Sequence, residues 1–313
     1  MNGIEKLFKA LSGEHLIVER DRPLAEFTTY KVGGPAAIAV TPQTVDELAT
    51  VARTIREFAP VEVVVVGKGS NLLVSDRGVS GVAILIGSNL AEIHFEGTHV
   101  TAQAGASLPV IARKSVAAGL TGFEWAVGVP GSIGGAVRMN AGGHGSDISE
   151  SFVDAQIVDL HEGTCQTWTA ETCRFGYRSS AIEAHHVVAS ATFALSAGDV
   201  VAGEAALSEI VTWRREHQPG GHNAGSVFAN PAGDSAGRLI EASGLKGHRN
   251  GGAMISDKHA NFIQTDATAT ANDVVGLMEL AQQQVFDTFG VKLHLENRLV
   301  GFSADQQQRL GVV

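Results

Sequence analysis

The spacing of apolar and polar residues predicts a chain of mixed helices and strands. From Thr44 to Phe58 apolar residues recur every three or four positions, and Thr44 with Glu47 forms a capping box, so this segment is expected to be a helix. Val61–Val66 is a β-branched run without polar alternation, as expected for a strand buried on both faces of a parallel or mixed sheet. A glycine-containing turn leads to a second apolar strand, Leu72–Val74.

The same periodicities place elements farther along the chain. We predict helices from Ser107 to Gly119 and over Val201–His217, Asp234–Ser243 and Thr270–Phe289, and strands over Phe152–Leu160, Thr164–Thr169, His186–Leu195 and Val291–Val300. The first two of these strands are expected to form a hairpin. The last strand is amphipathic, with these residues on its apolar face: Val291, Leu293, Leu295 and Leu299.

Length and composition narrow the class of protein. At 313 residues the chain exceeds one ordinary core, and we place domains at 1–84, 85–205 and 206–313. A net charge of −10 argues against a nucleic-acid partner or insertion at an anionic membrane, and no apolar run reaches the length of a membrane span. Only Cys165 and Cys173 occur, without a CxxC motif, so we expect free thiols in a reducing compartment, the cytoplasm.

The most unusual segment is Gly122–Gly145, which is dense in glycine and almost free of charge. Each glycine costs about 0.5–1 kcal/mol relative to alanine in regular structure, so such a run indicates that something approaches the backbone closely. A flat cofactor and another piece of the protein both meet this requirement. The amide of Asn140, which donates and accepts hydrogen bonds, would suit a planar ring.

A second glycine motif, Gly67–Leu72, lies between two predicted strands. A dinucleotide fingerprint needs a third glycine where Leu72 stands and a helix after it, and neither is present. Two interpretations remain: an anion-binding nest of successive N–H groups, or a plain β-turn.

Other catalytic signatures are weak. Gly131–Gly135 resembles only a fragment of a serine-hydrolase elbow. The twelve histidines show no metal-ligand spacing, adjacent His185 and His186 should point to opposite faces of a strand, and we predict no metal site. Three polar residues in apolar or glycine-rich surroundings could carry chemistry: Arg178, Ser226 and Glu296. An arginine can bind a carboxylate and a serine can deliver a proton, but a surface ion pair or a turn explains each residue equally well.

Taken together, the motifs resemble a known family. Seven occur in the order seen in the MurB family of UDP-N-acetylenolpyruvoylglucosamine reductases: FTTYKVGGP (27–35), GKGSNLLV (67–74), GVPGSIGGA (128–136) with MNAG (139–142), YRS (177–179), GSVFANP (225–231), GLKG (244–247) and HANF (259–262). The chain has only two tyrosines, Tyr30 and Tyr177, and a short run after Ser179, so it resembles the subtype without an inserted tyrosine-bearing loop.

The resemblance implies an α+β fold: an FAD-binding fold of the vanillyl-alcohol oxidase (PCMH) type in two subdomains, with a C-terminal substrate domain. It implies FAD as cofactor and NADPH as electron-donating co-substrate. The residues expected to hold FAD are Gly67, Lys68, Gly69, Ser70, Asn71, Leu72, Pro130, Gly131, Ser132, Ile133, Gly135 and Asn140.

The implied reaction reduces the enolpyruvyl group of a UDP-sugar to a D-lactyl ether in peptidoglycan precursor synthesis. Hydride would come from flavin N5 and the proton from Ser226, while Arg178 and Glu296 would stabilise an enolate-like intermediate. The residues expected to hold the diphosphate and sugar are Tyr177, Asn230, Lys246 and Arg298. The alternatives are an FAD-dependent oxidase of the same fold and a non-catalytic flavin-binding module.

Overall fold

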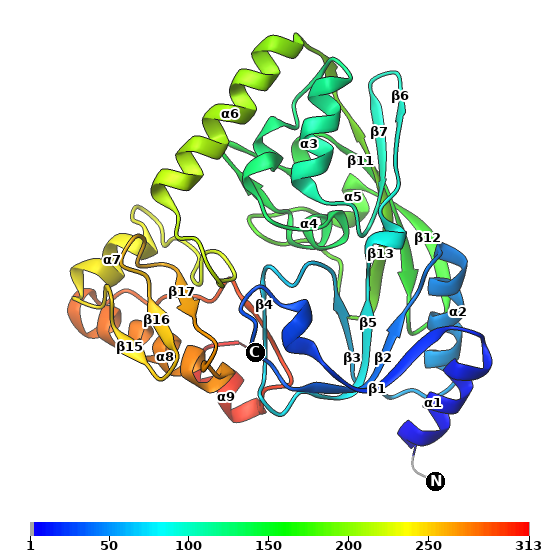
Figure 1. Cartoon of the computed structure of the whole chain (residues 1–313), viewed down its shortest axis with the longest axis horizontal. Helices are drawn as coiled ribbons and strands as arrows, with labels where there is room; N and C mark the ends of the chain where they lie inside the picture. Colours follow the sequence, from blue (N-terminus) through cyan, green and yellow to red (C-terminus); the bar gives the residue numbers. More distant parts are fainter. Residues whose placement is uncertain (1–2, 313) are drawn as a thin grey trace. The chain divides into compact units, whose positions relative to one another are not determined.

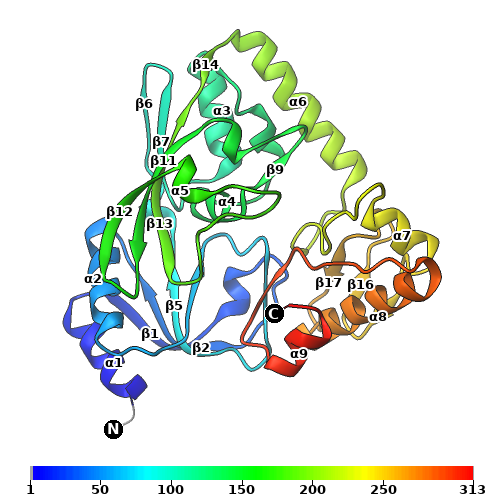
Figure 2. The ribbon, with the colours of Figure 1, turned by 180° about the vertical axis from the view of Figure 1, so that it is seen from behind.

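The computed structural model describes residues 3–312, which form two compact units (Figures 1 and 2). Unit 1 contains the residues up to Arg20, then Ile38–Lys68 and Gly81–Arg214. Unit 2 contains Asp21–Ala37, Gly69–Ser80 and the chain from Arg215 onward. The two units are therefore interleaved along the sequence, and the three-domain division stays a prediction.

Unit 1 is built around two sheets. The first has strand order β1-β2-β5-β3, with bounds Ile17–Pro23, Pro35–Thr41, Val79–Leu85 and Val63–Val66. The second has order β12-β11-β13-β7-β6, with bounds Thr164–Thr169, Phe152–Asp159, His186–Ala194, His99–Gln103 and Ile93–Glu96. Unit 1 also contains two separate pairs of two-residue strands: β8 (Leu120–Thr121) with β14 (Ser196–Ala197), and β9 (Gly142–Gly143) with β10 (Ser146–Asp147).

Helices cover these sheets through apolar faces. Helices α1 (Gly3–Gly13) and α2 (Val45–Arg56) share one core with side chains of both sheets, and Leu48 of α2 is buried in it. The second core lies between the five-stranded sheet and helices α3 (Leu108–Ala117) and α4 (Ile133–Met139). The remaining helices and 3₁₀ turns of this part of the chain are η2 (Ser88–Leu90), η3 (Glu124–Gly128), η4 (Ile148–Glu150), α5 (Ala170–Cys173) and α6 (Val200–His217).

Unit 2 packs helices on a small antiparallel sheet. Strands β15 (Arg249–Asn250), β16 (Ala253–Ile255) and β17 (Ile263–Thr265) form the sheet, and α8 (Ala271–Phe289) buries Val274, Leu277 and Met278 in the same core. A separate parallel pair joins β4 (Leu72–Val74) to β18 (Arg298–Val300). The other elements of this unit are η1 (Leu24–Phe27), α7 (Ala236–Ala242) and α9 (Ala304–Arg309).

The sequence signals for helix ends are confirmed. The hydroxyl of Thr44 accepts a hydrogen bond from the N–H of Glu47 at the start of α2. The Glu47 carboxylate accepts the N–H of Gln43 instead of that of Thr44, so the predicted capping box is only half formed. Thr270 and Asp273 form the capping box of α8, and Gly290 ends that helix in the left-handed region at φ 66°. The hairpin is confirmed as β11–β12, and β3 pairs in parallel with β5. The predicted burial of β3 on both faces is wrong, because β3 is an edge strand and only Val66 is fully buried.

One strand prediction is largely wrong. Of the expected strand Val291–Val300, only Arg298–Val300 forms a ladder, and Leu295 makes a single isolated bridge to Phe228. The alternation that suggested a strand instead reflects an extended segment whose alternate side chains pack on unit 2. Strands β3 and β4 also belong to different sheets, because the glycine motif between them leads from unit 1 into unit 2.

Candidate functional site

The two predicted glycine motifs meet in unit 1. Gly67 follows β3, and Ser132 is the buried residue that precedes α4. A Cβ atom on Gly67 would lie 2.4 Å from Ser132 Oγ and 3.7 Å from Ser132 Cβ. The serine hydroxyl therefore occupies the space of a side chain at position 67, and a larger residue there would force this hydroxyl to turn away.

The segment after Gly67 is held in an unusual backbone shape. Gly69 has a φ of +62°, and a Cβ there would lie 2.0 Å from the carbonyl oxygen of Phe27. The carbonyl of Gly69 accepts hydrogen bonds from the N–H (3.2 Å) and the hydroxyl (3.3 Å) of Thr29. Among the hydrogen bonds within either unit of residues 3–312, none is donated by a backbone N–H of Gly67–Asn71. This arrangement favours the anion nest over the plain turn.

The long glycine stretch has two uses. A Cβ on Gly128 would lie 2.7 Å from His144 Nε2, and one on Gly142 would lie 2.5 Å from Asp147 Cβ, so these glycines are needed for packing inside the protein. Gly135 is different: it is exposed, and a Cβ there would have no atom within 4 Å. Only part of the stretch is therefore open to a ligand.

The other residues predicted to hold FAD differ in their exposure to solvent. Pro130 and Lys68 are exposed, and Gly131 accepts a hydrogen bond from the N–H of Leu108 through its carbonyl. Ile133 is fully buried in the core, and its N–H donates to Ala106, so its side chain is not available to a ligand. Ser70 and Leu72 are half-buried in unit 2.

Asn140 ends α4 in the left-handed region and is 3% exposed. Its Nδ2 donates to Asp147 Oδ2 (3.2 Å) and to the carbonyl of Gly176 (3.0 Å), and its Oδ1 accepts from the N–H of Ser149 (3.1 Å). The amide is thus engaged within the protein. Its contact with a cofactor stays a prediction, and the geometry favours a role in holding the segment that carries Arg178.

Arg178 lies in that segment, between α5 and β13 of unit 1. Its backbone has a φ of 52°, and its Nη2 donates to the carbonyl of Gly142 at 2.7 Å. Tyr177 is 65% exposed, and the guanidinium carbon lies 5.0 Å from the centre of its ring. The guanidinium is therefore tied to the glycine-rich segment of the same unit.

Ser226 and Glu296 are brought together in unit 2. The carbonyl of Val227, next to Ser226, accepts the N–H of Glu296 at 2.8 Å. The carbonyl of Glu296 accepts a hydrogen bond from Asn71 Nδ2 at 3.1 Å. Two of the three predicted catalytic residues thus share one backbone framework, while Arg178 belongs to unit 1.

The residue that organises this framework is Asn297, which is 3% exposed. Its Nδ2 donates to Asn71 Oδ1 (2.9 Å) and to the carbonyls of Ala224 (3.1 Å) and Ser226 (3.3 Å). Its Oδ1 accepts from the hydroxyl of Tyr30 at 2.9 Å. Tyr30 is fully buried, and burial raises the pKa of its hydroxyl far above the ordinary value, so it remains a donor.

Asn297 and Tyr30 were not among the predicted site residues. The sequence did contain an indication of a buried Asn297, because this residue continues the alternation of Val291, Leu293 and Leu295 on the apolar side of the segment. An amide at such a position must be hydrogen-bonded inside the protein. The side chain of Asn71 is bonded to the Glu296 carbonyl and to Asn297, and its contact with FAD stays a prediction.

The predicted sugar and diphosphate residues of unit 2 lie on its surface. Asn230 Oδ1 accepts the N–H of Ala236 at 3.0 Å, close to the start of α7. Lys246 Nζ pairs with Glu241 Oε1 at 3.0 Å. Arg298 is exposed, and its N–H donates to the carbonyl of Asn71. Substrate binding by these residues remains a prediction.

The histidine prediction is wrong in one respect. His185 and His186 do not point to opposite faces of a strand, because β13 begins only at His186, and their ring centres lie 3.9 Å apart. With Asp159 they form a cluster whose potential metal-ligating atoms all lie within 4.8 Å of one another.

Comparison with known proteins places this geometry in a family. Residues 36–169 match the family described as "FAD binding domain", and residues 217–300 match "UDP-N-acetylenolpyruvoylglucosamine reductase, C-terminal domain". The UDP-N-acetylenolpyruvoylglucosamine reductase of Anoxybacillus flavithermus is 40% identical over 300 residues, which cover 95% of this chain and 98% of that protein. The chain belongs to the UDP-N-acetylenolpyruvoylglucosamine reductase family.

Other members of the reductase family agree. The Bacillus subtilis enzyme is 39% identical over 284 residues, covering 90% of this chain and 93% of that protein. The crystal structure of the Thermus caldophilus reductase matches with a TM-score of 0.79 and 34% identity, covering 91% of this chain and 99% of that one. The predicted fold class and family are confirmed, and the protein is an FAD-dependent oxidoreductase.

The residues of the site fit this cofactor. Within either unit of the described residues, the backbone N–H groups of Gly67–Asn71 donate no hydrogen bond, and such groups are the donors that a pyrophosphate needs. Exposed Gly135 leaves the start of α4 open to a flat ring. No helix of residues 3–312 is both long and apolar enough to cross a membrane.

Proposed function

We propose that this enzyme reduces the enolpyruvyl group of UDP-N-acetylglucosamine enolpyruvate, with NADPH as electron donor, to the D-lactyl ether of UDP-N-acetylmuramate. The family relationship supports this substrate, because the relatives carry the reductase name over nearly their whole length. The observation that carries the proposal is the shared framework of Ser226 and Glu296, which Asn297 holds in place. A flavin-binding module would have no use for it.

Bound FAD would supply the hydride. The chain's own residues would manage the charge and the proton that the reaction requires. Hydride addition to an enol ether is favourable only if the neighbouring carboxylate accepts developing negative charge, and a guanidinium stabilises such charge. Arg178 would have this role, and the hydrogen bond from its Nη2 to the Gly142 carbonyl would hold the guanidinium in position.

Ser226 would protonate the neighbouring carbon. Among the hydrogen bonds described for residues 3–312, none involves the Ser226 hydroxyl, whereas its carbonyl is held by Asn297. A serine hydroxyl is a weak acid in water, but the substrate carbanion is far more basic, so ionisation beforehand is unnecessary. Glu296, held through both its N–H and its carbonyl, would stabilise the same intermediate.

Substrate binding would use surface groups of both units. We assign the diphosphate and sugar to Tyr177, Asn230, Lys246 and Arg298, because each presents hydrogen-bonding or charged atoms on the surface of its unit. Lys246 would have to exchange its partner Glu241 for a phosphate, and an exposed ion pair of this kind is weak. We also assign the reaction to the cytoplasm, where Cys165 and Cys173 stay reduced.

The test is product formation by the purified protein and by Ser226→Ala. The protein should be yellow and should convert the UDP-enolpyruvyl sugar to the lactyl ether with NADPH, as followed by mass spectrometry. Ser226→Ala should keep its flavin and its reduction by NADPH but lose about 10²–10⁴-fold in turnover. Ser243→Ala, whose hydroxyl bonds to the carbonyl of Leu239, is the matched control. Normal turnover by Ser226→Ala would remove Ser226 from the mechanism.

A further inference from the structure

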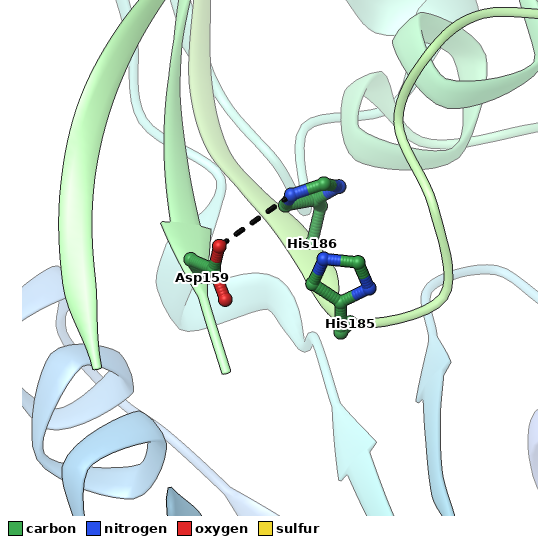
Figure 3. A group of neighbouring side chains, drawn as sticks. All are labelled: Asp159, His185 and His186. Carbon is green, nitrogen blue, oxygen red and sulfur yellow. Dashed lines mark ion pairs between the residues drawn. The ribbon is translucent and has the colours of Figure 1, made fainter. Parts of the chain in front are cut away.

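Away from the proposed active site, an aspartate and a histidine face each other across two strands of the five-stranded sheet. Asp159 ends β11 and His186 begins β13, and they are direct cross-strand partners. Asp159 Oδ2 lies 3.6 Å from His186 Nε2 (Figure 3). This separation is too long for a hydrogen bond but close to that of two atoms on one metal ion. Ligands 2.0–2.1 Å from a tetrahedral zinc lie about 3.3 Å apart.

Both groups are positioned by hydrogen bonds from their other atoms. Asp159 Oδ1 accepts the backbone N–H groups of His161 (2.8 Å) and Glu162 (3.1 Å). His186 Nδ1 accepts the N–H of Glu183 at 3.0 Å. The two bonds to Asp159 leave Oδ2 facing His186, and outer hydrogen bonds of this kind orient the ligands of metal sites. The bond to His186 holds its ring in place but must break before Nε2 can bind a metal.

His185 completes the cluster. A ring nitrogen of His185 faces the space between Asp159 and His186 (Figure 3). Each of the three residues offers one potential ligand atom, and these atoms all lie within 4.8 Å of one another. The ring of His161 stacks on that of His185, with centres 4.1 Å apart and planes 7° from parallel. Because the two rings are parallel, His161 supports His185 rather than adding a converging ligand.

We propose that Asp159, His185 and His186 bind one divalent transition-metal ion, with zinc as the best fit. Two imidazoles and a carboxylate suit zinc, copper and nickel, whereas magnesium and calcium prefer oxygen ligands alone. Three protein ligands leave one position for water.

Binding requires a proton to move. Because His186 Nδ1 accepts the Glu183 N–H, the neutral ring carries its proton on Nε2, where the metal would bind. When zinc takes Nε2, that proton moves to Nδ1 and the Glu183 N–H turns to water. Glu183 is exposed, so water can replace the lost partner. The ion would join the β11–β12 turn to the start of β13 and would be structural rather than catalytic.

The experiment is isothermal titration calorimetry of the FAD-loaded protein with zinc chloride, and with magnesium chloride for comparison. Wild type should bind one zinc ion with a Kd of about 10 μM or tighter and should unfold at a higher temperature with zinc. Asp159→Asn keeps the Oδ1 acceptor and replaces only the facing oxygen, so it should fold and bind zinc at least about tenfold more weakly. His185→Ala should show the same loss.

His94→Ala is the matched control, because His94 is an exposed histidine on β6 of the same sheet. It should bind zinc as wild type does. A flavin spectrum and far-UV circular dichroism will show whether each variant is folded. Equal zinc binding by wild type, Asp159→Asn and His185→Ala would mean adventitious binding to surface histidines and would overturn the proposal. Absence of a saturable zinc site below about 1 mM, or equal binding of magnesium, would also overturn it.

Discussion

Asn297→Ala should destabilise unit 2 by an amount that follows from its hydrogen bonds. The substitution removes the acceptor of the buried Tyr30 hydroxyl and a donor to the carbonyl of Ala224, a residue that is 2% exposed. A buried polar group left without a partner costs about 1–3 kcal/mol, so these two groups give about 2–6 kcal/mol. Asn71 is half-buried and can turn to water, so it adds little. For a unit of this size the melting temperature should fall by at least about 5 °C.

Differential scanning calorimetry of the FAD-loaded protein measures this change. The control is Asn272→Ala, an exposed asparagine in the first turn of α8 of the same unit, which should shift stability by no more than about 0.5 kcal/mol. Because the same network holds the carbonyls of Ser226 and Glu296, Asn297→Ala should also lower turnover. If the two variants melt within a degree of each other, Asn297 does not organise this framework and the reasoning is refuted.

Two further predictions concern other parts of the site. Gly67→Ala should weaken FAD retention, measured by flavin release on dilution, because the new methyl group would lie 2.4 Å from Ser132 Oγ. Adding Ser132→Ala should restore part of the retention, since the nearest remaining Ser132 atom would lie 3.7 Å away. A double variant that retains no more FAD than Gly67→Ala would contradict the claim that the fit of Gly67 against Ser132 supports FAD binding. Burial raises the folded-state pKa of Tyr30, so above pH about 10 the unfolded chain releases that proton first and stability falls as pH rises. Urea unfolding at pH 9 and pH 11 should show a smaller loss for Tyr30→Phe than for wild type, and identical losses would rule Tyr30 out as the cause.

Local signals in the sequence were sufficient for many elements. The capping residues of α2 and α8 satisfy the first N–H groups of those helices through side chains three positions apart, which the sequence alone displays. The glycine motif at 67–72 was likewise readable, because Gly69 adopts a backbone conformation that favours glycine. Its resemblance to a family then connected it to the segment around Ser132, and the structure places Gly67 against that serine.

Long-range contacts were not readable in the same way. Asn297 bonds to Tyr30, which is 267 positions away in the sequence, and no local pattern specifies that partner. His185 and His186 were treated as strand neighbours, but the strand starts between them, and a one-residue error in a boundary reverses which side a residue faces. Val291–Asn297 shows strand alternation without a strand, because one-sided burial produces the same pattern in any extended segment.

The central claim is that Ser226 and Glu296 act with a bound flavin to reduce an enolpyruvyl sugar. Anaerobic stopped-flow spectroscopy tests it most directly, by mixing the purified protein first with NADPH and then with UDP-N-acetylglucosamine enolpyruvate. The account predicts that NADPH bleaches the flavin absorbance and that the sugar nucleotide restores it, rapidly in wild type and about 10²–10⁴-fold more slowly in Ser226→Ala. A flavin that stays reduced with the sugar nucleotide and regains its colour only in air would contradict the claim.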